Sequence, residues 1–136
     1  MKSQPTIRPV YGKTNLSPRA VGRLAVKRFG SVIGLNPKRE QYYRELHANV
    51  WPGVLGRLKK AHVRNYSIYV AELKGKKYLF SYFEYTGRDI QKDMRAIAGD
   101  PETRRWWKET DPCQVQLPGR KPGANWTELE QVFLME

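Results

Sequence analysis

Hydrophobic residues recur along the chain with two different periods. In four segments, aromatic, β-branched and other apolar residues form short runs or alternate with small and polar residues, which is typical of strands. These segments are residues 29–35, 64–73, 76–85 and 127–135. Only Lys74 and Gly75 separate the second segment from the third, so we expect a β-hairpin with a two-residue turn.

Two longer segments repeat apolar residues at intervals of three and four, as amphipathic helices do. The first covers residues 37–61 and starts after Asn36, a residue type that often caps helices. Proline lacks an amide hydrogen and clashes with the preceding turn, so Pro52 predicts a break near Trp51. The second covers residues 88–108 and is interrupted by a Gly-Asp-Pro sequence.

The order of these elements is strand, helix, strand, strand, helix, strand. A Pro- and Gly-rich loop over residues 111–124 precedes the last strand. This βαββαβ order predicts an α+β sandwich of the ferredoxin-like type, in which helices cover one face of the sheet. The other face also needs cover, so we expect a homodimer of the dimeric α/β barrel type.

Basic residues are concentrated at the N-terminus. The formal net charge is +12, and residues 1–28 hold seven basic residues and no acidic one, so +7 lies in this segment and +5 in the rest. We therefore expect a basic, flexible N-terminal extension over residues 1–28, with a short helix over 18–27, and one domain over residues 29–136. An organellar transit peptide is the alternative interpretation of the extension.

The composition of the chain argues against several classes of protein. It has no run of about 18 apolar residues, so we expect no membrane-spanning segment. Cys113 is the single cysteine and cannot form an internal disulfide, and the N-terminus has no apolar signal-peptide core. Both features favour a cytoplasmic protein. The modest charge outside the extension argues against a nucleic-acid partner.

Tyr43 and His47 lie four residues apart in the first predicted helix, so their side chains are neighbours on one face, with Trp51 one turn further along. Histidine can donate and accept a proton near neutral pH, and tryptophan can stack on the C–H face of a sugar. This cluster is therefore a candidate catalytic site. A hydrogen-bonded histidine in the core is the alternative.

Other predicted elements carry candidate residues for the walls of a binding site. Trp106 and Trp107 point about 100° apart on a helix, so both rings cannot enter the core equally, and one is expected to line a cavity or a dimer interface. The second strand places Tyr66 and Tyr69 on opposite faces, and either tyrosine could face the same pocket. Glu84 interrupts an aromatic run on the third strand, which fits either a buried acid that orients a partner or a surface position.

The sequence does not indicate a cofactor site. His47, His62 and Cys113 cannot supply a zinc site with recognisable spacing. The sequence also has no phosphate-binding glycine loop. We therefore expect neither a metal ion nor a cofactor.

Several of the candidate residues belong to a recognisable pattern. Tyr43-Arg-Glu-Leu-His47 followed by Trp51-Pro52 resembles the Y-x3-H-x3-W-P signature of L-rhamnose mutarotases. Four further segments are similar to that family. They are Asn36-Pro37 and residues 65–69, 105–108 and 128–133. The resemblance runs from about residue 29 to the C-terminus.

The resemblance implies a fold, an activity and a set of site residues. Members of the family are ferredoxin-like homodimers that interconvert the α and β anomers of L-rhamnose without a cofactor. By resemblance, His47 is the proton donor in the acid/base opening of the ring of L-rhamnose or a related deoxysugar. The residues around the sugar are Tyr43, Tyr66, Trp106 and Trp107, with Trp51 and Glu84 as candidates for a supporting role.

The chain departs from the family pattern at two places. Gly53 follows Trp51-Pro52, where the family often has a glutamate, and a tryptophan often found near Gln91 is absent. Both differences bear on substrate choice.

Two alternative functions fit the same predicted elements. The first is that of a dimeric α+β enzyme acting on another small molecule, of the monooxygenase or isomerase type. The second is that of a non-enzymatic RNA-binding module, because RNA-recognition domains share the βαββαβ order and the chain is basic. Against the second, residues 76–83 lack the glycines of the RNA-recognition signature.

Overall fold

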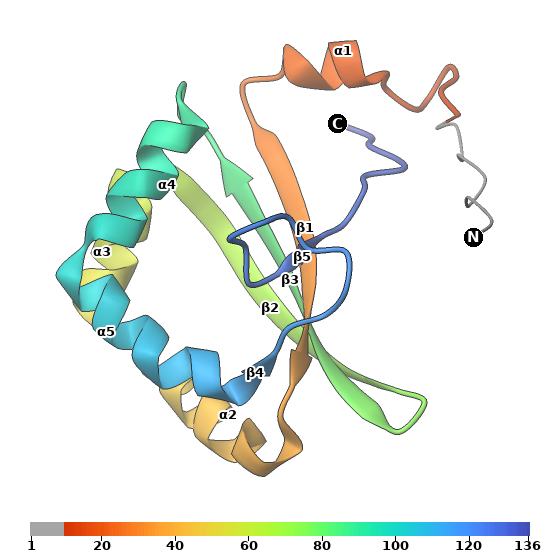
Figure 1. Cartoon of the computed structure of the whole chain (residues 1–136). Helices are drawn as coiled ribbons and strands as arrows, with labels where there is room; N and C mark the ends of the chain where they lie inside the picture. The colour runs from red at the N-terminus through yellow and green to blue at the C-terminus, as the bar shows by residue number, and fades with distance from the viewer. Residues whose placement is uncertain (1–9) are drawn as a thin grey trace.

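A layer of helices packs against one face of an antiparallel sheet in the computed structural model, which describes residues 10–136 (Figure 1). The strands are β1 (Lys27–Leu35), β2 (Val63–Leu73), β3 (Lys76–Tyr85), β4 (Gln114–Val115) and β5 (Thr127–Glu128). The helices are α1 (Pro18–Gly22), α2 (Glu40–Ala48), α3 (Pro52–Lys60), α4 (Ile90–Gly99) and α5 (Pro101–Thr110), with 3-10 turns η1 (Pro37–Arg39) and η2 (Asp111–Cys113).

The sheet has the strand order β2-β3-β1-β4, and β5 also pairs with β1. All of these pairings are antiparallel. The first and third strands of the βαββαβ order are therefore neighbours at the centre, as in a ferredoxin-like sandwich. The predicted α+β fold is confirmed.

The turns and breaks between elements lie where the sequence predicts them. Lys74 and Gly75 have φ angles of 51° and 76°, which is the left-handed backbone that a two-residue hairpin requires. The first long helix is broken between Ala48 and Pro52, which starts α3. The second is broken at Asp100, whose side chain caps α5.

The last predicted strand is wrong in length. Residues 127–135 were expected to form one strand, but only Thr127–Glu128 pairs with β1, and β4 lies inside the predicted loop 111–124. Beyond the Leu129 amide, which donates to the Gly30 carbonyl at 2.8 Å, the tail does not pair with β1. The tail instead meets the N-terminal segment, where the Asn15 side chain donates to the Val132 carbonyl at 2.7 Å and accepts from the Leu134 amide at 3.3 Å.

The N-terminal helix is shorter than predicted. Ser17 caps α1 as expected, but the helix ends at Gly22 and not at residue 27. Lys27 already belongs to β1, and its Nζ donates to the carbonyls of Gly22 and Leu24, so these carbonyls have partners outside a helix. Residues 1–9 of the predicted extension lie outside the described residues, and the division at residue 28 stays a prediction.

Two hydrophobic clusters join the helices to the inner face of the sheet. The first consists of Ile33, Leu35, Tyr43, Leu79 and Cys113. The second consists of Ala61, Val63 and Ile97, with Leu58, Phe83 and Met94 packed against it. Residues of both clusters also line one cavity, so each cluster supports one end of that cavity.

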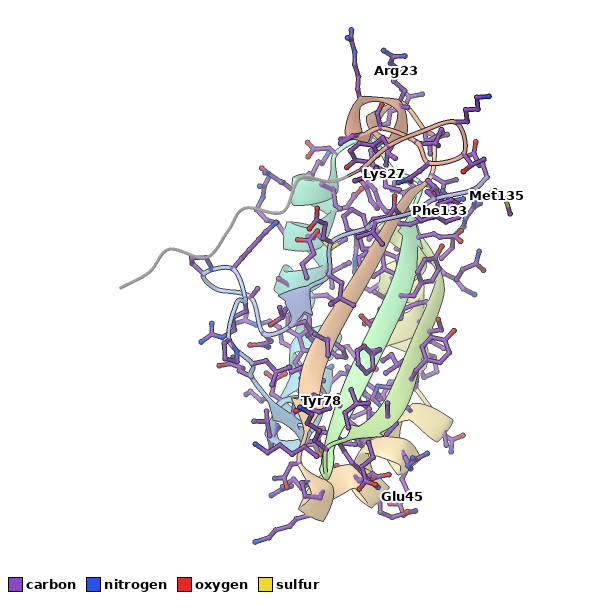
Figure 2. All side chains as sticks on the ribbon, turned by 90° about the vertical axis from the view of Figure 1, so that its right-hand side faces the viewer. Arg23, Lys27, Glu45, Tyr78, Phe133 and Met135 are labelled. Carbon is purple, nitrogen blue, oxygen red and sulfur yellow. The ribbon has the colours of Figure 1, made fainter. Side chains whose placement is uncertain are left out.

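The outer face of the sheet has no helix over it in the described part of the chain (Figure 1). Figure 2 looks onto this face, with Tyr78 towards its lower end and the tail residues Phe133 and Met135 near its upper end. Tyr69 on the same face is 60% exposed. Among residues 10–136, no helix combines the length and apolar character needed to cross a membrane.

Candidate active site

A cavity of about 710 Å³ lies between the helix layer and the inner face of β2 and β3. Five predicted site residues from three different elements line it. They are Tyr43 and His47 of α2, Tyr66 of β2, and Trp106 and Trp107 of α5. The structure therefore brings together side chains that are up to 64 positions apart in the sequence.

His47 is held by contacts within its own helix and with α5. Its ring stacks on Tyr43, with ring centroids 4.1 Å apart, and meets Trp106 edge-on at 5.3 Å. Its Nδ1 lies 2.8 Å from the Tyr43 carbonyl oxygen. A carbonyl only accepts hydrogen bonds, so Nδ1 carries the hydrogen and Nε2 of the neutral ring has a free lone pair.

The surroundings of His47 also favour its neutral form. Burial lowers the pKa of His47 below its usual value, and the hydrogen bond to the Tyr43 backbone opposes this only in part. At neutral pH the ring is therefore uncharged, with Nε2 able to take up a proton. This arrangement suits a general base.

Tyr43 is 4% exposed and belongs to the first hydrophobic cluster. Burial raises the pKa of Tyr43 well above its ordinary value, with hydrogen bonding from Gln114 acting in the opposite direction. The phenol therefore stays protonated over the physiological range. Tyr43 can donate a hydrogen bond to a ligand but is a poor base.

Tyr66 lies at a β-bulge on β2, on the same face of the strand as the cavity residues Ile68 and Val70. The pairing with β3 shifts between Arg64 and Ser67, where Asn65 has a φ angle of 49°. Tyr66 faces the cavity and packs against Phe83, with ring centroids 5.6 Å apart. Although 44% of the residue is exposed, its hydroxyl lies among protein atoms, and this burial raises the pKa of Tyr66.

The two adjacent tryptophans have different environments, as the helical geometry predicts. Trp106 is 6% exposed, while Trp107 is 38% exposed. Both line the cavity, whereas we had expected this of only one. Trp51 is not part of the wall but meets Trp106 edge-on at 5.2 Å, so it supports the wall from behind.

Glu84, like Trp51, does not line the cavity. Side chains alternate along a strand, and Phe83 of β3 faces the cavity, so Glu84 points to the outer face. There it accepts hydrogen bonds from Tyr82, Asn65 and Arg64 at 2.8, 2.9 and 3.1 Å. The bond from Tyr82 is the main reason that the pKa of Glu84 is lowered. These contacts do not support a role next to a bound sugar.

Several cavity residues were not singled out from the sequence, among them Thr103, Phe83 and Arg44. Thr103 precedes Trp106 by three positions on α5, so helical spacing would have placed it on the same face. Phe83 follows from strand alternation. Arg44 also lines the cavity and forms an ion pair with Glu40 at 2.9 Å. The sequence around Arg44 does not indicate that it lines the cavity.

Gly53 at the start of α3 has a carboxylate against it. The carboxyl group of Glu102, on α5, lies where the Cβ of any other residue at position 53 would be. The helix α3 has no acidic residue in its first turn and no side-chain cap, so Glu102 brings the negative charge that a helix N-terminus favours. The chain thus carries a carboxylate beside position 53, although residue 53 itself is glycine.

Among residues 10–136, no group of three or more His, Cys, Asp or Glu side chains is placed to hold a metal ion. Known proteins resemble the chain over most of its length. The sequence model of L-rhamnose mutarotase matches residues 28–135. The chain belongs to the L-rhamnose mutarotase family.

Relatives of known sequence cover most of the chain. The L-rhamnose mutarotase of Bacillus subtilis (strain 168) is 27% identical over 111 residues, which is 82% of this chain and 100% of the relative. That of Lactiplantibacillus plantarum is 29% identical over 109 residues, which is 80% of this chain and 98% of the relative. The resemblance to L-rhamnose mutarotases found in the sequence is therefore confirmed.

A solved structure agrees with the fold. The crystal structure of an L-rhamnose mutarotase from Formosa agariphila matches with a TM-score of 0.59 and 26% sequence identity. The match covers 81% of this chain and 99% of that one. The two-layer fold of this protein is therefore similar to that of the L-rhamnose mutarotase.

Proposed function

We propose that the protein is a sugar mutarotase that interconverts the α and β anomers of L-rhamnose or a closely related deoxysugar. The observation that carries this proposal is the position of His47. Its Nδ1 is bound to the Tyr43 carbonyl, which leaves Nε2 free for a ligand in a cavity walled by aromatic side chains. Membership of the L-rhamnose mutarotase family supports the same activity.

Mutarotation needs the transfer of one proton at each of two neighbouring oxygens. A base removes the proton from the anomeric hydroxyl. The electron pair of the broken O–H bond forms the carbonyl at C1, and the bond from C1 to the ring oxygen breaks. The ring oxygen receives a proton from an acid. Rotation about the C1–C2 bond and the reverse steps then give the other anomer, so no net proton is consumed.

The tautomer of His47 supports a particular order of these transfers. Nδ1 already holds a hydrogen, so the neutral ring cannot act as an acid through Nε2. In our proposal, Nε2 first takes the anomeric proton and the resulting imidazolium then delivers it to the ring oxygen, which is bonded to the same carbon. This changes the expectation that His47 acts first as the proton donor.

The remaining wall residues would bind and orient the sugar. Trp106 and Trp107 offer flat apolar surfaces for the C–H face of the pyranose. The raised pKa values of Tyr43 and Tyr66 keep both phenols protonated, so each can donate a hydrogen bond to a sugar oxygen. We assign to Trp51 the support of Trp106, and we assign no role at the sugar to Glu84.

We also propose that the protein is a homodimer formed through the outer face of the sheet. Aromatic side chains of alternate positions on β2 and β3 share that face, among them Tyr69, Tyr78, Phe80 and Tyr82. A group of aromatic side chains on an uncovered sheet face is a candidate interaction surface. In a homodimer, the second chain would cover this face and remove its aromatic side chains from water.

We propose a basic N-terminal extension over residues 1–28 before a domain over residues 29–136, and a cytoplasmic location. The buried, unpaired thiol of Cys113 is in keeping with a reducing compartment. We propose no nucleic-acid partner and no cofactor.

Saturation-transfer NMR on an equilibrium mixture of L-rhamnose anomers tests the activity. We expect exchange to be faster than in the buffer control, and His47→Ala to remove the acceleration while the circular dichroism spectrum is retained. His62→Ala is the matched control, because His62 lies outside the cavity and pairs with Asp93 at 3.2 Å. An unchanged rate in His47→Ala, or no acceleration by the wild type, would contradict the proposal.

A further inference from the structure

The cavity is larger than a free monosaccharide requires. Its volume of about 710 Å³ lies within the roughly 300–1,000 Å³ that is typical of sites for drug-sized ligands. A single pyranose is much smaller than such ligands. A sugar bound at His47 therefore leaves a large part of the cavity unfilled.

The two ends of the cavity differ in chemistry. His47 and Tyr43 lie at the end supported by the first hydrophobic cluster. The far end is supported by the second cluster, and the residues of this cluster that line the cavity are all apolar. They are Leu58, Val63, Phe83, Met94 and Ile97. Tyr66, a polar cavity residue, packs against Phe83. A sugar hydroxyl placed among the apolar residues would lose its hydrogen bonds to water without gaining others, at a cost of about 1–3 kcal/mol.

The side chains that line the far end do not fill it. Leu58, Phe83 and Met94 are only partly buried, so each keeps apolar surface that a ligand can cover. Apolar cavities of this kind hold water poorly and bind apolar groups. The far end is thus suited to a hydrocarbon group.

We propose that this far end is a subsite for an apolar O-alkyl or O-acyl substituent on the deoxysugar. The inference rests on the proposed function, because it places the anomeric carbon at His47. The anomeric hydroxyl must be free for the ring to open, so the substituent must be elsewhere on the sugar. C4 lies across the six-membered ring from C1, so a substituent on O4 points away from His47 and towards the second cluster.

Comparison of two sugars with the full-length wild-type protein tests the subsite. Saturation-transfer NMR would give the half-saturating concentrations of L-rhamnose and of 4-O-butyl-L-rhamnose. Each buried methylene contributes about 0.8 kcal/mol, or about fourfold in affinity. We expect the half-saturating concentration of the butyl sugar to be at least about tenfold lower, because two or more methylenes would leave water.

Met94→Gln tests the location of the subsite, because it keeps the length of the side chain but adds a polar group at the far end. We expect the half-saturating concentration of the butyl sugar to rise about tenfold while that of L-rhamnose is unchanged. Met94→Leu is the matched control and should retain the preference for the butyl sugar.

The possible failures are distinguishable. Acceleration of L-rhamnose exchange without tighter binding of the butyl sugar would overturn the subsite and leave the mutarotase function standing. An equal effect of Met94→Gln on both sugars would also overturn it, since that indicates a general structural change. Failure to accelerate either sugar would overturn the proposed function itself, and the subsite with it.

Discussion

At the scale of single residues, the proposed acid/base chemistry depends on which ring nitrogen of His47 carries the hydrogen. The spacing of Tyr43 and His47 predicts that their side chains meet, and the two rings are stacked with centroids 4.1 Å apart. The spacing does not predict that Nδ1 binds the Tyr43 carbonyl, because a histidine side chain can adopt several rotamers. That contact and the burial of the ring together favour a neutral base with Nε2 free.

The pH dependence of anomer exchange tests this protonation state. Burial lowers the pKa of His47 below about 6.5, so the neutral form persists at neutral pH and is lost only in more acidic solution. The enzyme-dependent rate should therefore be level above pH 7 and should fall as the pH drops through the pKa of His47. NMR exchange rates between pH 5 and pH 8, after subtraction of the buffer rate, measure this. A rate that rises on acidification would instead indicate that the imidazolium starts the reaction.

At the scale of elements, two proline-initiated helices are brought together at their N-termini. Pro52 begins α3 and Pro101 begins α5, and both breaks are predictable because proline restricts the backbone locally. The sequence does not indicate that Glu102 of α5 lies against Gly53 of α3. That contact depends on how the two helices pack, and it occurs next to Trp51, which supports the cavity wall.

A double-mutant cycle on Gly53 and Glu102 tests the contact between the helices. Alanine is a better helix former than glycine by up to about 1 kcal/mol, so Gly53→Ala should stabilise α3 when nothing opposes it. In the wild type, the new Cβ must displace the Glu102 carboxylate from the N-terminus of α3, so the gain should be cancelled. We expect stabilisation by roughly 0.5–1 kcal/mol only in the Glu102→Ala background.

Urea unfolding of the four proteins measures the coupling between the two positions. The wild type, both single variants and the double variant should have similar m-values, so that differences in midpoint report stability. Equal effects of Gly53→Ala in both backgrounds would show that the Glu102 carboxylate does not occupy this place in solution.

At the scale of the whole molecule, the two faces of the sheet have different surroundings. Helices cover the inner face of the sheet (Figure 1), and the cavity lies between the two layers. Aromatic side chains, among them Tyr78 (Figure 2), lie on the outer face. The βαββαβ order predicts this asymmetry, because both helical connections pack on the same side of the sheet. It also motivates the proposed dimer.

Tyr69→Lys tests the proposed dimer, because Tyr69 lies on the outer face and is 60% exposed. Two lysines buried in an interface without partners would be strongly unfavourable. We expect sedimentation equilibrium to give about twice the chain mass of 15.9 kDa for the wild type and the mass of one chain for the variant. Tyr42→Lys is the matched control, since Tyr42 is 38% exposed on α2, away from the sheet. A wild type of single-chain mass would contradict the proposal.

The sequence by itself determined those features that depend on neighbouring residues. Periodicity indicated the long strands and helices, proline indicated the breaks, and Lys74-Gly75 indicated the hairpin, because each acts through local backbone geometry. Tertiary structure decided the features that depend on distant contacts. The tail binds the Asn15 side chain where a longer last strand was expected, and the helices pack on the Phe83 side of the sheet, which leaves Glu84 on the outer face. The apolar far end of the cavity likewise exists only because α3, α4 and the sheet pack around it.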